Sequence, residues 1–360
     1  MIPTPDFNEV SRHWKLSASE TPGYGIIRND SVFRAGFRTS PVFESQYHEL
    51  QEMRRDLEDR YRDYDVGEVF SGESICNPEG SCFRILTEIN EEFIWPASEV
   101  IRKRLMNDLT LVRGIGPVKA KLLRKRGYRT VEDLTQNKIF HTDAEICADI
   151  ISHGTSEQVV RLIRRWYPPS HPLVALSSTL YGRENFLFVD LETLGFFSRP
   201  IILFGLAGFQ NQKLVIQQYL VRDMEEELAA LSETIGLVMG KPVVVSFNGK
   251  AFDLPYLVSR SAFYGASPVY TGLHIDLLHV ARRLFRGSIQ DCRLGTIERY
   301  VLDIDRRTDI PGSFVPEFYE SYQRTGNPGP LIPVVEHNRE DIVTLARLLA
   351  YLSGGGGYGS

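Results

Sequence analysis

The sequence places acidic residues inside stretches that otherwise look like core. FLFVDLETLG, residues 186–195, is an apolar run typical of a buried strand, yet it contains Asp190 and Glu192. Because side chains alternate faces along a strand, two residues two positions apart point the same way. Two neighbouring carboxylates repel each other unless a basic side chain, a shared proton or a metal ion joins them.

A second stretch supplies another acid. VVVSFNGKAFDLPYL, residues 243–257, predicts a strand, a turn at Asn248 and a helix whose first turn carries Asp253. Asn248 ends the strand beside the predicted acids and could contact a sugar or phosphate, although turn formation explains it slightly better. Asp276 precedes another predicted helix, where it acts either as a further acid near the site or as an N-cap.

A third stretch pairs a histidine with an acid. VVEHNREDIVTLARLLAYL, residues 334–352, predicts an amphipathic helix. His337 and Asp341 are four residues apart and therefore share one face of it. An imidazole titrates near neutral pH, so His337 is a candidate general base, or else a histidine that only forms hydrogen bonds.

The three stretches, in this order, resemble the DnaQ-like (DEDD) exonucleases of the ribonuclease H-like superfamily. Residues 183–352, with CRLGTIERYVLD, DIPGSFVPEFYESYQRTG and EHNREDI, are similar to the YprB-type ribonuclease H-like domain. The resemblance implies a five-stranded mixed sheet flanked by helices, with the acids clustered at its centre. It also implies a set of four metal-binding carboxylates: Asp190, Glu192, Asp253 and Asp341.

Four carboxylates suit cleavage of a phosphodiester bond with two Mg²⁺ or Mn²⁺ ions. Two ions about 3.5 to 4 Å apart activate the attacking water and neutralise the leaving oxygen. Mg²⁺ prefers hard oxygen ligands and keeps several waters. We expect Asp190 to bridge the ions, and we expect metal to stabilise the fold, because otherwise the acids repel each other and some carboxylate pKa values rise.

The spacing between His337 and Asp341 differs from that in one branch of the family that the sequence resembles. In the histidine-type branch four residues separate the base from the last Asp, whereas here three do, which is the spacing of the tyrosine-type branch. Thr193 and Leu194 follow the first acid pair. By the same resemblance, we expect them to lie against the terminal nucleotide.

A basic segment lies upstream of the acids. Residues 101–129 carry ten Lys and Arg against one acid, Asp108, so the net charge of the segment is +9. Such a charge suits a phosphate-binding surface and a solvated helical face about equally well.

Within this segment, LVRGIGPVKAKLLRKRGYRTVEDL, residues 111–134, resembles the helix-hairpin-helix motif, with Pro117 opening the second helix. Glycines in the turn let backbone amides approach a phosphate closely, which grips nucleic acid without reading its sequence. The alternative is a hairpin that only packs two helices or contacts protein. The predicted contacts are Arg113, Gly114, Gly116, Lys119 and Lys121.

The composition narrows the class of protein. With 360 residues, 42% of them hydrophobic, the chain is long enough for two or three globular domains. Its longest apolar stretches are far shorter than the roughly 20 residues of a membrane-spanning helix, and its N-terminus has no secretory pattern. We therefore expect a cytoplasmic protein without membrane contact. A net charge of −5 argues against a globally basic surface, and four scattered cysteines argue against disulfides or zinc.

The pattern along the chain predicts an α/β protein in several parts. A mixed α+β N-terminal region of unknown role contains a charged helix and a hairpin around NPEG, and a Pro- and Ser-rich linker is expected at 167–183. The predicted parts are the N-terminal region 1–98, the helical segment 99–170 with the hairpin at 111–134, the nuclease domain 180–353 and a flexible tail 354–360.

We therefore expect a metal-dependent nuclease, and more narrowly a 3′–5′ exonuclease, that cuts DNA or RNA. The sequence does not decide between these two nucleic acids, and it indicates no protein partner. Two alternatives stay open. One is a non-catalytic nucleic-acid-binding module on a nuclease fold, and the other is a structure-specific endonuclease.

Overall fold

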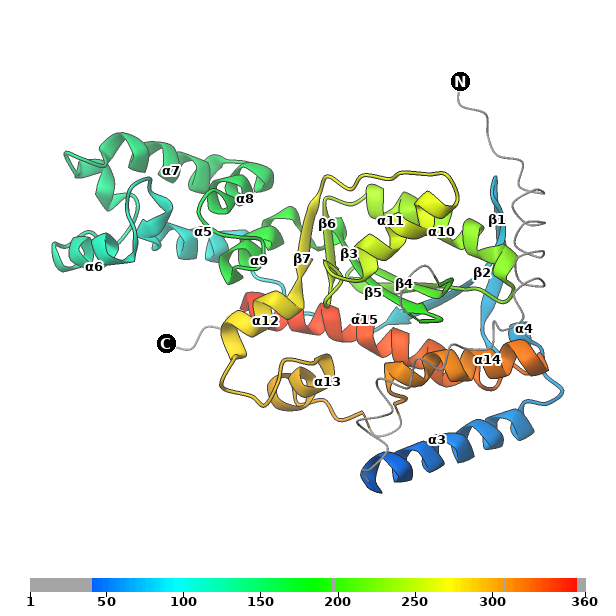
Figure 1. Ribbon diagram of the computed structural model, residues 1–360. Helices are drawn as coiled ribbons and strands as arrows, with labels where there is room; N and C mark the ends of the chain where they lie inside the picture. The colour runs from blue at the N-terminus through cyan, green and yellow to red at the C-terminus, as the bar shows by residue number, and fades with distance from the viewer. Residues whose placement is uncertain (1–40, 196–198, 307–308, 355–360) are drawn as a thin grey trace.

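The computed structural model describes residues 41–195, 199–306 and 309–354. Residues 1–40 of the predicted N-terminal region and residues 355–360 of the predicted tail lie outside this description. A seven-stranded mixed sheet forms the centre, in the order β1-β2-β5-β4-β3-β6-β7 (Figure 1). The strands are β1 (Gly72–Asn77), β2 (Gly80–Ile89), β3 (Phe186–Thr193), β4 (Ile201–Gln210), β5 (Lys213–Leu220), β6 (Val243–Ser246) and β7 (Leu273–Asp276).

Five of these strands come from the part predicted as the nuclease domain. β3, β4 and β5 form an antiparallel meander, and β6 and β7 extend the sheet beyond β3 in parallel. The predicted hairpin around NPEG is confirmed as β1 and β2. The mixed α/β character of the chain is confirmed as well.

The predicted strand count of five was wrong, because the N-terminal hairpin joins the same sheet. β2 pairs antiparallel with β5 from Phe83 opposite Leu220 to Ile89 opposite Leu214. An edge strand presents unpaired N–H and C=O groups that another strand can bond. β5 would be such an edge, and β2 covers it with a segment more than 120 residues earlier in the sequence.

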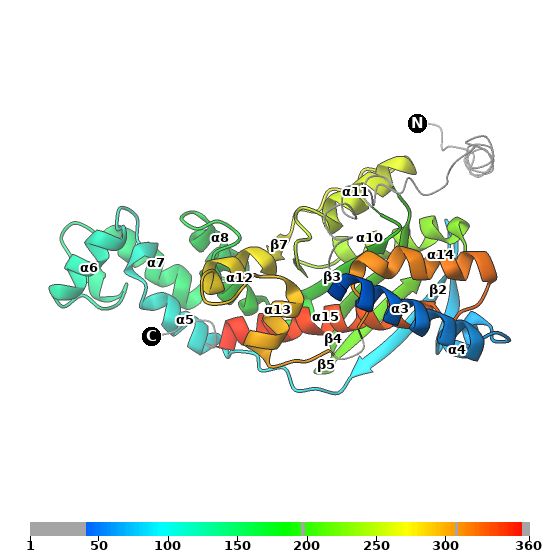
Figure 2. The same cartoon turned by 60° about the horizontal axis from the view of Figure 1, so that its bottom comes forward.

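The sheet is covered by helices on both faces. α10 and α11 pack on the face that carries Leu187 and Val189, whereas α9, α12 and α15 pack on the face that carries Phe186 and Phe188. α14 lies beside α15, and α3 lies outside α14 (Figure 2). Within the described part of the chain, no helix is both long and apolar enough to span a bilayer.

The helices are α3 (Pro41–Arg60), α4 (Val66–Val69), α5 (Ser98–Met106), α6 (Pro117–Lys125), α7 (His141–His153), α8 (Ser156–Arg164), α9 (Pro172–Ser178), α10 (Glu227–Met239), α11 (Asp253–Phe263), α12 (Leu277–Phe285), α13 (Leu294–Ile297), α14 (Val315–Thr325) and α15 (Leu331–Gly354). Short turns of helix are η1 (Leu109–Leu111), η2 (Asp133–Gln136), η3 (Thr179–Tyr181), η4 (Arg183–Asn185), η5 (Met224–Glu226), the π-helical η6 (Glu298–Leu302) and η7 (Gly312–Phe314).

The predicted linker at 167–183 was wrong. The middle of it is helix α9, whose residues Val174, Ala175 and Leu176 are buried against α15 and α12. Pro172 is the first residue of this helix, a position where the missing N–H of proline costs nothing. Pro172 therefore starts a core helix that joins the helical unit α5–α8 to the sheet.

Candidate active site

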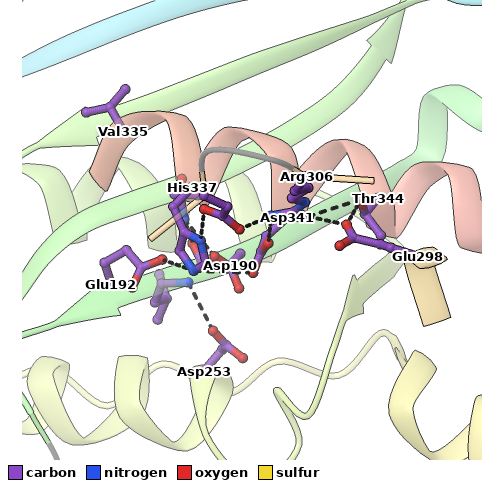
Figure 3. Close-up of polar contacts among 12 residues, drawn as sticks. Asp190, Glu192, Asp253, Glu298, Arg306, Val335, His337, Asp341 and Thr344 are labelled. Carbon is purple, nitrogen blue, oxygen red and sulfur yellow. Dashed lines mark hydrogen bonds and ion pairs between the residues drawn. The ribbon is translucent and has the colours of Figure 1, made fainter. Parts of the chain in front are cut away.

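The two acids of β3 lie on the face of the sheet that α15 covers. Phe186 and Phe188 point into the core on this side, and the alternation of the strand continues it to Asp190 and Glu192. Glu192 is 9% exposed. The same alternation that buries the aromatic rings therefore aims two carboxylates at α15 (Figure 3).

Asn338 of α15 holds Asp190 in place. Its side-chain Nδ2 donates to Asp190 Oδ2 at 2.7 Å and to the Asp190 carbonyl at 3.1 Å, while Gln218 Nε2 donates to Asn338 Oδ1 at 2.9 Å. Gly205 faces Asp190 across the β3–β4 pair. A Cβ at Gly205 would lie 2.1 Å from Asn338 Oδ1, so only glycine lets the helix come this close.

Asp253 reaches the site from the first turn of α11. Its Oδ1 accepts a hydrogen bond from the Leu191 amide at 3.1 Å, and the residue is 4% exposed. The contact ties the start of α11 to the strand residue between Asp190 and Glu192. The three acids from two distant stretches thus meet at one place in the fold.

The turn before Asp253 is fixed by Asp276. Asn248 adopts a left-handed conformation with φ of 64°. Its amide and that of Lys250 donate to Asp276 at 2.8 and 3.1 Å, and Asp276 also caps α12 by accepting from the Leu278 amide. The structure therefore gives Asn248 a turn-forming role and Asp276 a capping role, and a contact from Asn248 to nucleic acid stays a prediction.

His337 lies among three acids. Its Nδ1 is 2.7 Å from Asp309 Oδ1, and its Nε2 is 3.9 Å from Glu192 Oε1 and 3.8 Å from Asp341 Oδ2. Burial by itself opposes the charge on this ring, but the hydrogen bond to Asp309 and the nearby carboxylates raise the pKa of His337 to about 10. A ring with this raised pKa carries a proton on both nitrogens at neutral pH and cannot accept a proton until it loses one.

Asp341 has a basic neighbour that the sequence analysis did not select. Arg306 Nη1 is 2.5 Å from Asp341 Oδ1 and 3.1 Å from Asp309 Oδ2. Arg306 Nη2 contacts the buried Glu298 and lies 3.2 Å from Thr344 Oγ1 (Figure 3). Arg306 lies between CRLGTIERYVLD and DIPGSFVPEFYESYQRTG, and Asp309 is the first residue of the second stretch; the spacing of neither residue points at the acids.

The electrostatics show strong repulsion among the acids. Burial, followed by the charge of Asp341, raises the pKa of Asp190 to about 7. Burial and the charge of Asp190 also raise the pKa values of Glu192 and Asp253 well above their usual range. A nearby cation stabilises the ionised form of such carboxylates. Mg²⁺ and Mn²⁺ prefer hard oxygen ligands, so this set of donor atoms fits either ion.

The tightest possible metal group differs from the predicted one. Among the described residues, the ligand atoms of Asp309, His337 and Asp341 all lie within 4.8 Å of one another. The predicted quartet forms no group that close, and His337 Nε2 lies 3.9 Å from Glu192 and 3.8 Å from Asp341. Asp309 belongs to the site by contact although the sequence analysis did not choose it.

Thr193 and Leu194 follow the acids directly. Thr193 is 9% exposed, and its Oγ1 donates to the Gly195 carbonyl at 2.9 Å. Leu194 is half-buried against the cluster around α14 and α15. The nearby Tyr256 donates its hydroxyl to the carbonyls of Gly195 and Arg199. These contacts organise the end of β3, and a contact to the terminal nucleotide stays a prediction.

The predicted hairpin residues lie away from the acids. Gly114 has φ of 80°, which glycine adopts without strain, and α6 starts at Pro117 directly after Gly116. Lys119 Nζ donates to the Gly114 carbonyl at 2.9 Å. The helix before the turn is only the 3₁₀ turn η1. Arg113, Lys119 and Lys121 are exposed, and α6 lies at the far end of the helical unit (Figure 1).

Comparison with known proteins agrees with the fold. Residues 187–353 match the protein family described as the RNase_H superfamily. These residues therefore form a ribonuclease H-like domain, and they include all four predicted metal ligands.

Two curated relatives and one solved structure are similar to parts of the chain. The uncharacterized protein YprB of Bacillus subtilis (strain 168) is 31% identical over 185 residues, which cover 49% of this chain and 44% of that protein. DNA polymerase 1 of Aeropyrum pernix is 25% identical over 218 residues, which cover 51% of this chain and 22% of the polymerase. The family B DNA polymerase of Pyrobaculum calidifontis aligns with a TM-score of 0.38 and 17% identity over 46% of this chain and 24% of the polymerase. The chain thus spans less than half the length of the curated relatives it matches.

Proposed function

We propose that the ribonuclease H-like domain is a metal-dependent nuclease that hydrolyses phosphodiester bonds. The observation that carries the proposal is the meeting of Asp190, Glu192 and Asp253 with Asp341 at one place, where burial and mutual repulsion raise the pKa values of the first three. These four residues would hold the ions. When bound, two such ions activate water for in-line attack and stabilise the leaving oxygen.

The protein side chains around the acids have their own tasks. Asn338 orients Asp190, and the Leu191 amide orients Asp253. The His337 imidazolium offsets the charge of Glu192 and Asp341, and it becomes a general base only after losing its proton. Metal ions held by these acids would add positive charge beside the His337 ring and so would favour loss of its proton.

The narrower proposal is a 3′–5′ exonuclease. Thr193 and Leu194 would lie against the terminal nucleotide, as the family resemblance implies. The hairpin glycines Gly114 and Gly116 with Arg113, Lys119 and Lys121 would hold the nucleic-acid backbone at a distance from the site. DNA and RNA are both proposed substrates.

One observation favours the non-catalytic alternative. Arg306 forms an ion pair with Asp341, and His337 Nε2 lies 3.9 Å from Glu192, so these acids have basic neighbours without any ion. Such a site could survive as a scaffold in a nucleic-acid-binding module. Three acids with raised or strongly raised pKa values argue against it, because a purely structural cluster gains nothing from keeping them.

The experiment is a cleavage assay with purified protein. DNA and RNA labelled at either end, in single- and double-stranded form and in branched form, are incubated with Mg²⁺, Mn²⁺ or EDTA. Asp190→Asn tests the site, and Asp149→Asn, an exposed acid of α7, is the matched control. We expect cleavage with metal in the control and the natural protein alone.

The pattern of products separates the remaining options. A ladder that shortens from the 3′ end indicates the exonuclease, and a discrete cut at a junction indicates the endonuclease. Binding without cleavage under all conditions indicates the non-catalytic module. Cleavage that persists in EDTA or in Asp190→Asn would overturn the metal-dependent site.

A further inference from the structure

The two oxygens of Asp341 have different surroundings. Oδ1 is 2.5 Å from Arg306 Nη1. Oδ2 is 3.8 Å from His337 Nε2, on the side of the acid cluster. One oxygen is thus engaged by the protein, and the other faces the place where the acids meet.

Arg306 is held by several acceptors besides Asp341; its Nη1 also lies 3.1 Å from Asp309 Oδ2. Its Nη2 contacts Glu298, which is 3% exposed, and lies 3.2 Å from Oγ1 of Thr344, which is 1% exposed. Thr344 also donates to Glu298. The guanidinium side chain is 12% exposed. A guanidinium group that donates to several acceptors at fixed positions has little freedom to move toward or away from Asp341.

Arg306 has acidic partners besides Asp341. Glu298 supplies a buried negative charge for the guanidinium, and Asp309 Oδ2 lies 3.1 Å from its Nη1. Asp341 therefore keeps its own charge for an ion, although Arg306 binds one of its oxygens. A lone arginine that simply replaced a metal ion would need no such buried partner.

We infer that Arg306 is a positioning residue for Asp341, which holds Oδ1 and leaves Oδ2 to the metal ions; this inference rests on the proposed function. Residues that orient metal ligands change metal affinity by about 10- to 100-fold when they are removed. If Arg306 instead competed with the ions for Asp341, replacing it would remove a positive charge and strengthen metal binding rather than weaken it.

The test is Mn²⁺ binding, measured as free Mn²⁺ by electron paramagnetic resonance. The main variant is Arg306→Gln with Glu298→Gln, which removes one positive and one negative charge and leaves no buried unpaired ion. The single Arg306→Gln and the conservative Arg306→Lys accompany it. Arg299→Gln is the matched control, since Arg299 lies in η6, is 66% exposed and pairs with Asp305 at 3.5 Å.

We expect the double variant to bind Mn²⁺ at least about tenfold more weakly, Arg306→Lys to lie between it and the natural protein, and Arg299→Gln to be unchanged. Cleavage by the double variant should recover at high Mn²⁺. Unchanged or tighter binding in a double variant with a normal melting transition overturns the inference alone. Failure of the natural protein to bind Mn²⁺ overturns the proposed function and this inference with it. If the double variant does not fold, the Mn²⁺ affinity of Arg306→Lys is the test. Weaker binding than in the natural protein then supports the inference, and unchanged or tighter binding overturns it.

Discussion

Asn338 donates its side-chain amide to both the carboxylate and the carbonyl of Asp190, and this contact joins α15 to β3 at the centre of the acids. Asn338 is fully buried. The close approach depends on Gly205, whose missing Cβ leaves room for the amide. Sheet, helix and acid are therefore fixed together by one side chain.

Asn338→Asp should destabilise the protein in a pH-dependent way. The change keeps the shape but places a buried carboxylate beside Asp190, and burial raises the pKa of such a group. A raised acid pKa in the folded state means that the loss of stability grows as pH increases from 5 to 8. Urea unfolding at both pH values measures it. Asn90→Asp, at an exposed position, is the control, and an equal loss at both pH values would contradict the explanation.

Asp190→Asn should stabilise the metal-free protein at high pH. The folded-state pKa of Asp190 is raised from 3.8 to about 7, so ionised Asp190 lowers stability as pH rises through that interval, by on the order of 2 to 4 kcal/mol at most. In EDTA at pH 8 the variant should melt higher than the natural protein, and the difference should vanish near pH 4. Scanning calorimetry measures both, and a lower melting temperature at pH 8 would count against the repulsion.

Metal binding should strengthen with pH. The ligands bind as carboxylates, so ions displace protons from groups with raised pKa values such as Asp190. We expect the apparent Mn²⁺ affinity to increase between pH 6 and 8, with proton release. Calorimetric titration in two buffers of different ionisation enthalpy measures that release. An affinity independent of pH, with the same heat in both buffers, would contradict the assignment.

His337→Gln should destabilise the metal-free protein most at low pH. The folded-state pKa of His337 is raised from 6.5 to about 10, so its contribution is complete below pH 6.5 and is lost as pH rises toward 10. The gap between natural protein and variant should therefore narrow from pH 6.5 to 10 in EDTA. His153→Gln, an 80% exposed histidine paired with Asp149, is the control. A gap that widens with pH would refute the counter-charge role.

A buried ion pair outside the site offers a prediction that does not depend on function. Arg260 and Glu227 are 2% and 1% exposed and contact each other, while the Ile201 amide and the Tyr264 hydroxyl donate to Glu227. Arg260→Met should cost about 3 to 5 kcal/mol, since it leaves a buried charge unpaired. Arg260→Met with Glu227→Met should recover much of that loss in urea unfolding. A double variant no more stable than the single would contradict this.

Much of the fold and part of the site follow from local patterns. The alternation of β3 already places Asp190 and Glu192 on one face with Phe186 and Phe188, and helical spacing places His337 beside Asp341. The order of the motifs predicts a ribonuclease H-like domain. Patterns of this kind are read correctly because periods of 2 and 3.6 residues are properties of the backbone itself.

Only the tertiary structure determined the contacts between segments that are distant in the sequence. β2 became a strand of the central sheet because the open edge of β5 needed hydrogen-bond partners, and α9 became core because α12 and α15 cover it. Arg306 and Asp309 joined the acids although their spacing carries no signal, and Asn338 did so from a predicted helix in which only His337 and Asp341 had been singled out. Which charge meets which depends on how the chain folds back on itself, and that is settled by packing and burial across the whole domain rather than by any short stretch of sequence.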